Sequence, residues 1–149
     1  MRVDGAMDPH PKGWARPSTT LQRAPYVLGT TPRRVHVIDT FVSADSPLEL
    51  PNFAVAPIGQ GVVARALDNS SITPPAYVDS LVQVARARGV KLQVGTTNGG
   101  NDGSVFTPYG VVDVAMGWPL RYSRSPAEVV DLRDVVSLAD MIQAVGETW

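Results

Sequence analysis

The sequence predicts an α/β fold, a layered sheet with helices packed on it. Short apolar runs with strand character alternate with segments of helical periodicity, and glycines or prolines mark their boundaries. Such alternation is typical of α/β domains in which the strands are at least partly parallel. The chain has 149 residues, of which 44% are hydrophobic and 18% are charged, as expected for one soluble globular domain.

Residues 1–32 are predicted to form an irregular N-terminal arm. The stretch shows no sustained periodicity and contains five prolines: Pro9, Pro11, Pro17, Pro25 and Pro32. Each proline removes a backbone donor and disfavours helix in the residue before it. The α/β domain is therefore expected to occupy residues 33–149.

The first strand is expected at residues 35–42, which are almost all apolar, aromatic or β-branched. Because side chains alternate along a strand, Asp39 falls within an apolar face and His36 points to the other face. A carboxylate in an apolar row is costly unless it is paired or metal-bound. For Asp39 we expect either pairing with a cation or a metal-ligand role, and the latter requires ligands from another chain.

The middle of the sequence predicts a strand at residues 62–67, a helix and a strand at residues 90–94. The helix should begin near Thr73, where two prolines suit its first turn, and should end at Gly89. Its expected buried stripe follows helical spacing: Val78, Leu81, Val82 and Ala85.

The remaining elements follow a glycine-rich loop at residues 95–104, which should lead into a short helix up to Tyr109. Residues 111–116 are nearly all apolar and are expected to form a central strand covered on both faces. A last helix should begin at Asp131 and end at Gly146. Its expected buried stripe is Val135, Leu138, Ala139 and Ile142.

Composition narrows the possible functions. The net charge of −1 gives no reason to expect a nucleic acid or an anionic membrane as a partner. No apolar run approaches the roughly 20 residues that span a bilayer, and the first residues lack an apolar signal core, so a cytoplasmic location is expected. The chain has no cysteine, which excludes disulfides and thiolate metal sites, and it has only two histidines.

Three segments at expected strand ends resemble, in order and spacing, the tetrahedral glutamyl/leucyl-type metallo-aminopeptidases. This family includes deblocking aminopeptidases and proteins named cellulases. Residues 37–47 are similar to the strand and loop that supply a metal-ligand aspartate. Gly-Gly-Asn-Asp-Gly at 99–103 is similar to the family's Gly-Gly-Thr-Asp-Ala loop. Pro-Leu-Arg-Tyr-Ser-Arg-Ser-Pro at 119–126 is similar to its Pro-x-Arg-Tyr-Met-His-Ser-Pro loop. The resemblance covers about residues 33–145, the C-terminal part of the catalytic domain.

The resemblance implies a zinc-aminopeptidase-like fold and removal of N-terminal residues from peptides at a centre of two divalent metals, zinc or cobalt. Asp39 corresponds to a metal-ligand aspartate, and Asp102 to a loop aspartate near the site. Arg121 and Tyr122 correspond to the residues that precede the family's histidine ligand. Arg124 occupies the place of that histidine and cannot bind a cation. No catalytic residue is assigned.

The family's other ligands belong to earlier parts of its chain, and nothing in residues 1–32 resembles them. Because a catalytic zinc typically needs three protein ligands, this chain alone is expected to lack a di-metal centre and to be weak or inactive. Arg124 is then either a surface arginine or a cation that fills the vacated metal position and pairs with Asp39.

Two classes of function follow. The chain is part of an aminopeptidase that acts on peptides with a complementary subunit or in an oligomer, or it is a non-catalytic binding or assembly module derived from the peptidase fold. Apolar surface left uncovered by the absent part of the domain predicts a homo-oligomer or a complementary subunit.

Overall fold

The computed structural model describes residues 32–47 and 56–149, so the predicted arm, Pro32 apart, lies outside the described residues. The elements in chain order are β1 (Arg34–Val42), β2 (Val62–Leu67), α2 (Pro75–Arg88), β3 (Leu92–Thr96), the 3₁₀ helix η2 (Asp102–Tyr109), β4 (Val112–Arg121), β5 (Val129–Val130) and α3 (Leu132–Thr148). The predicted α/β class is confirmed. Within the described ranges, no helix is long and apolar enough to cross a membrane.

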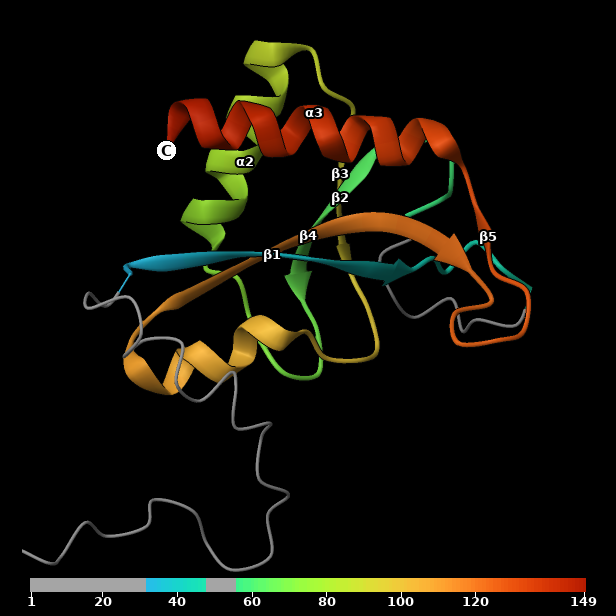
Figure 1. Ribbon diagram of the computed structural model, residues 1–149, viewed down its shortest axis with the longest axis horizontal. Helices are drawn as coiled ribbons and strands as arrows, with labels where there is room; N and C mark the ends of the chain where they lie inside the picture. The colour runs from blue at the N-terminus through green and yellow to red at the C-terminus, as the bar shows by residue number, and fades with distance from the viewer. Residues whose placement is uncertain (1–31, 48–55) are drawn as a thin grey trace, which may run out of the picture.

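The strands form one mixed sheet in the order β1-β4-β2-β3, with β5 paired to the end of β4 (Figure 1). β1 runs parallel to β4, and β2 runs parallel to β3, whereas β2 and β4 are antiparallel. β4 therefore lies between β1 and β2, as expected for a nearly all-apolar run.

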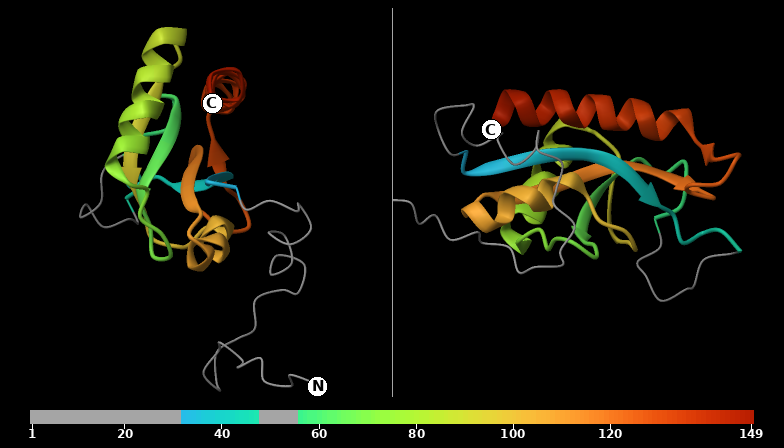
Figure 2. Two further views of the ribbon diagram at one scale, coloured as in Figure 1. Left: turned by 90° about the vertical axis from the view of Figure 1, so that its left-hand side faces the viewer. Right: turned by 60° about the horizontal axis from the view of Figure 1, so that its bottom comes forward.

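Helices α2 and α3 cover one face of the sheet, and η2 lies on the opposite face (Figures 1 and 2). The main core lies between the two long helices and the sheet, and its buried members include Val62, Ala64, Leu81, Val114, Met116, Leu138 and Met141. Complete burial of one such side chain contributes about 2 kcal/mol to the free energy of unfolding. This core fixes the sheet on which the candidate site is built.

Helix α2 confirms the predicted start and stop. Pro75 occupies its first turn, and Gly89 ends it in a left-handed conformation with φ 68°, where its N–H binds carbonyls of the last turn. Leu81 and Ala85 are buried as predicted, and Val84 joins them. Two members of the predicted stripe, Val78 and Val82, are only half-buried.

Helix α3 departs from the prediction. Asp131 caps it as expected, accepting a hydrogen bond from the N–H of Arg133, but the helix continues through Gly146 to Thr148. Its buried residues are Asp134, Leu138, Met141, Ala144 and Val145. Of the predicted stripe only Leu138 is buried, and Val135, Ala139 and Ile142 are exposed. The apolar residues occupy two sides of the helix, and among the described residues the sheet and α2 cover only one.

Strand β4 extends beyond the predicted end at residue 116 to Arg121, passing through Gly117 and Pro119. Gly117 permits a close approach to β1, because a Cβ atom added there would lie 1.7 Å from the carbonyl oxygen of Asp39. β3 is also shifted from its predicted range, to Leu92–Thr96. The longer β4 stays in register with β1 up to Leu120, opposite Val42, which brings the loops after both strands to one edge of the sheet.

Candidate functional site

Asp39 is oriented by two contacts near the carboxyl end of β1. Its Oδ1 accepts a hydrogen bond from the Thr40 N–H at 2.7 Å, and its Oδ2 lies 3.6 Å from Nη1 of Arg65. The Asp39 side chain remains 38% exposed. The structure thus supplies the predicted cation and leaves the carboxylate open to solvent.

Arg65 is the cation that sequence analysis missed. It lies on β2 with a side chain only 6% exposed, and its Nη1 is 3.0 Å from Oδ2 of Asp68. Its Nη2 also donates to the carbonyl oxygen of Thr40 on β1. Because β4 lies between β1 and β2, the guanidinium reaches across the width of a strand, next to the small residues Ala115 and Gly117.

Asp68 connects this cation to the glycine-rich loop. Its Oδ2 accepts a hydrogen bond from Nδ2 of Asn101 at 2.8 Å, and its Oδ1 accepts the N–H groups of Ser70 and Ser71, both at 2.8 Å. Burial raises the pKa of Asp68, but the hydrogen bonds from Asn101 and Ser70 and the charge of Arg65 outweigh burial and hold that pKa below its ordinary value.

The loop residue that joins the network is Asn101, whereas the predicted Asp102 is exposed in the first turn of η2. Asn101 Oδ1 accepts the N–H of Gly103 at 2.7 Å and caps the helix. The Asp102 side chain forms no hydrogen bond or ion pair with another residue within 32–47 or 56–149. Its role near the site stays a prediction.

Arg121 binds the loop that follows β1. Its Nε and Nη2 donate to Oδ1 and Oδ2 of Asp45 at 2.8 and 2.7 Å, a bidentate pair. The hydrogen bonds from Arg121 are the main cause that lowers the pKa of Asp45 to about 2. The segments at 37–47 and 119–126, which the sequence analysis singled out, therefore meet where β1 and β4 end.

The loop after β4 holds two non-glycine residues in the left-handed region, Tyr122 and Arg124, each with φ 62°. Such conformations typically cost about 1–3 kcal/mol each, and they persist where surrounding structure enforces them. The N–H of Arg124 donates to Oε1 of Glu128 at 2.6 Å. The Arg124 side chain is exposed and forms no ion pair with any described residue, so the hypothetical pair with Asp39 is not formed.

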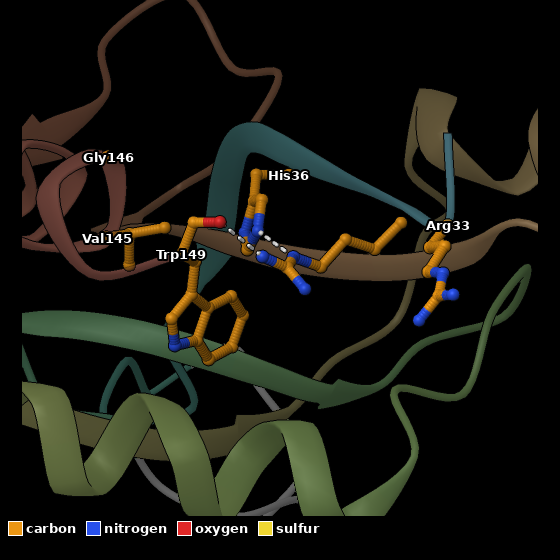
Figure 3. A pocket seen from close by; sticks show the side chains of 6 residues that line it. Arg33, His36, Val145, Gly146 and Trp149 are labelled. Carbon is orange, nitrogen blue, oxygen red and sulfur yellow. Dashed lines mark hydrogen bonds between the residues drawn. The ribbon is translucent and has the colours of Figure 1, made fainter. Parts of the chain in front are cut away.

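The described residues do not by themselves suit a divalent metal centre. No three histidine or carboxylate side chains among them gather closely enough to hold an ion. His36 lies on the face opposite Asp39, as the alternation along β1 predicted, and its ring is 5.1 Å from that of Trp149, which follows α3 (Figure 3). A metal at Asp39 would need ligands from outside this part of the chain.

The model of the M42 glutamyl aminopeptidase family matches residues 23–141. The chain belongs to this family. Asp39 and the loop containing Arg121, Tyr122 and Arg124 all fall inside the matched region.

Solved structures agree with the M42 assignment. The chain is 30% identical to the TET1 peptidase of Pyrococcus horikoshii, which assembles into a tetrahedron or an octahedral shell; the match has a TM-score of 0.71 and covers 85% of this chain and 37% of that one. It is 25% identical to an aminopeptidase of Desulfurococcus kamchatkensis, with a TM-score of 0.76 and coverage of 87% and 37%. The chain thus spans less than two fifths of the length of these M42-like structures.

Proposed function

We propose that this chain supplies the Asp39 portion of a metal-dependent aminopeptidase centre that is completed by ligands from outside its described residues. The reaction would be removal of N-terminal residues from peptides in the cytoplasm. Family membership and the likeness to two aminopeptidases support the reaction class. The metal, zinc or cobalt, comes from the family resemblance alone.

The observation that carries this proposal is the orientation and solvent exposure of the Asp39 carboxylate. A ligand carboxylate has to be held in one orientation by surrounding hydrogen bonds and still be accessible. Asp39 meets both conditions: the Thr40 N–H and Arg65 hold it, and its side chain is 38% exposed. Arg121 and Tyr122 would act beside the site by shaping the loop after β4, and Asp102 would act from the substrate side.

A specific observation favours a second candidate, a non-catalytic binding or assembly module. Arg124 stands where the family has a histidine ligand, and its side chain is exposed and free of ion pairs within the described residues. If Arg124 replaces one ligand, and if Asp39 finds no further ligands beyond the described residues, the chain would keep the fold without the metal centre. Assembly with a second copy or a complementary subunit belongs to both candidates.

A chimaeric enzyme, or graft, tests the first candidate function, the metal-dependent aminopeptidase centre. Residues 33–149 would replace the matching region of the Desulfurococcus kamchatkensis aminopeptidase, and aminoacyl-nitroanilide hydrolysis would be measured with cobalt or zinc. We expect activity in a graft carrying Arg124→His and a loss of at least about 100-fold on adding Asp39→Ala.

The lone chain serves as the comparison, with and without Asp39→Ala. Hydrolysis that persists at full rate in either Asp39→Ala protein would show that Asp39 is not a ligand. A folded, assembled graft that stays inactive with Arg124→His would favour the non-catalytic module.

A further inference from the structure

The glycine-rich loop after β3 contains an Asn-Gly pair, Asn98–Gly99, whose side-chain amide and following N–H are both unrestrained. The two residues are exposed, and among the described residues neither the Asn98 side chain nor the N–H of Gly99 forms a hydrogen bond. Gly99 has a φ of 99°, and a Cβ atom added to it would meet no heavy atom within 4 Å. The Gly99 nitrogen is therefore neither bonded to an acceptor nor shielded from the asparagine side chain.

An Asn-Gly pair in this state can react within itself. After base removes the amide proton of Gly99, the nitrogen attacks Cγ of Asn98. The N–Cγ bond forms, the Cγ–Nδ2 bond breaks, and the Nδ2 group takes up a proton and leaves as ammonia. A five-membered succinimide remains, and the step is unimolecular because both groups are held in adjacent positions of one chain. One water molecule then opens the ring: cleavage of the N–Cγ bond gives aspartate, and cleavage of the bond to the main-chain carbonyl carbon gives isoaspartate.

The other two asparagines of the described ranges are restrained by the fold. Asn69 is exposed, but the N–H of the next residue, Ser70, is held by Oδ1 of Asp68 at 2.8 Å. Asn101 is only 6% exposed, and its Nδ2 donates to Oδ2 of Asp68 at 2.8 Å. At Asn69 the attacking nitrogen is bonded to an acceptor, and at Asn101 the leaving group is bonded to one.

The same loop contains an Asp-Gly pair, Asp102–Gly103, which can form the same ring with loss of water. Here the attacking nitrogen is not free, because the N–H of Gly103 donates to Oδ1 of Asn101 at 2.7 Å at the start of η2. The sequence contains both pairs, and the fold leaves only Asn98–Gly99 free to react.

Reaction at Asn98 would change how the loop is held. The carbonyl oxygen of Gly99 accepts the N–H of Asn69 at 3.0 Å, and the N–H of Asn101 donates to Oγ of Ser70 at 3.0 Å. These two bonds dock the loop on the turn after β2. An isoaspartate lengthens the main chain by one carbon atom immediately before Gly99, so the two bonds lose their register.

We propose that Asn98 is a site of spontaneous deamidation and isoaspartate formation, which loosens the glycine-rich loop from the turn after β2 as the protein ages. Because Asn101 lies in this loop and binds Asp68, the change reaches the carboxylate that pairs with Arg65. The reaction needs only base and water. It takes place in the lone chain and does not depend on the proposed metal centre.

Ageing of the full chain in mildly alkaline buffer tests the site. Tryptic digestion yields one peptide, residues 92–121, that carries both Asn98 and Asn101. The mass of this peptide should rise by the difference between a hydroxyl and an NH₂ group, and fragmentation should place the change at Asn98. Isoaspartyl methyltransferase should label the product. No conversion at Asn98, or equal conversion at Asn101, would overturn the proposal.

Ageing in denaturant tests whether the fold selects the site. Unfolding releases the N–H of Gly103 from Asn101, so isoaspartate should appear at Asp102 in the unfolded chain and not in the folded chain. Formation of isoaspartate at Asp102 at equal rates in the two states would show that the hydrogen bond of Gly103 gives no protection.

Hydrogen exchange tests the structural consequence. The Asn69 amide should lose protection in the aged wild type, because its acceptor is the carbonyl of Gly99. Aged Asn98→Gln should keep this protection, since its side chain would have to close a larger, six-membered ring. Unaged Asn98→Asp carries the new charge without the longer main chain and should keep it too. Full protection in a chain converted to isoaspartate at Asn98, or equal loss in aged Asn98→Gln, would overturn the proposed loosening.

Discussion

Arg121 and Asp45 form a bidentate ion pair that joins the end of β4 to the loop after β1. The two residues are 76 positions apart in the chain, and the parallel pairing of β1 with β4 brings them together. The pair fixes the relative position of two loops that both border the candidate site. Its energetic contribution can be tested against an arginine in the loop after β4 that has no such partner.

Arg121→Ala should lower the free energy of unfolding by about 1–2 kcal/mol, because it removes two charge-assisted hydrogen bonds from a partly exposed pair. Arg124→Ala should change it by less than about 0.5 kcal/mol, since the Arg124 side chain is exposed. Chemical denaturation of both variants measures the difference. Equal losses would mean that the ion pair contributes nothing specific.

The same pair predicts a dependence of stability on pH. The carboxyl of Asp45 has a pKa near 2 in the folded chain against 3.8 in the unfolded chain. A lowered folded-state pKa stabilises the protein above the unfolded value, and this contribution is lost as the pH falls from about 4 through 2. After allowance for solvent screening, we expect the lowered pKa of Asp45 to contribute about 1 kcal/mol to the free energy of unfolding above about pH 4.

Asp131 also has a pKa lowered to about 2, so wild type alone cannot isolate Asp45. The measurement is therefore the difference in unfolding free energy between wild type and Asp45→Asn, taken from pH 6 down to about 2. The difference should shrink over the acidic range. A difference that stays constant would exclude Asp45 as the titrating group.

The hydrophobic pattern predicted the strands and helix α2 well, because the apolar residues of each of these elements are adjacent in the sequence or at helical spacing. It failed for α3, where apolar residues such as Leu138 and Val136 lie on opposite sides of the helix and only the fold decides which side is covered. It also ended β4 too early. Gly117 and Pro119 usually interrupt strands, and here close packing against Asp39 explains the glycine.

For the candidate site, the sequence identified Asp39 and the Arg121 loop through family resemblance, but it did not identify Arg65. That contact spans β4 and depends on strand order, which periodicity does not encode. A local signal did exist: Arg65 and Asp68 are opposite charges three residues apart at the end of a strand. The role of Asp39 as a ligand remains a prediction.

Alanine substitutions of Arg65 and Asp39 should lower the free energy of unfolding by very different amounts. Arg65→Ala should cost about 3–5 kcal/mol, because it leaves the fully buried Asp68 side chain without its cation. Asp39→Ala should cost about 1 kcal/mol or less, because the Asp39 side chain is partly exposed and Arg65 retains its ion pair with Asp68. Thermal and denaturant unfolding of both variants would check this order, and a larger loss for Asp39→Ala would contradict it.

Asp134 holds the turn before β2 against the first turn of α3. Its carboxylate is fully buried and accepts the N–H groups of Gly59 and Gly61 at 2.6 and 2.7 Å. Asp134→Ala leaves both buried N–H groups unpaired, so the unfolding free energy should fall by about 2–4 kcal/mol.

The unfolding free energy of Asp134→Asn should lie between those of wild type and Asp134→Ala, because an amide oxygen still accepts one N–H while its NH₂ group opposes the other. Asp140→Ala is the matched control, since Asp140 is exposed on the same helix and its substitution should cost less than about 0.5 kcal/mol.

Amide hydrogen exchange adds a local measurement. The Gly59 and Gly61 amides should lose protection in Asp134→Ala before the core amides of β4 do, because the turn loses its acceptor while the sheet keeps its ladder. Unchanged protection at both glycines would show that other contacts hold the turn.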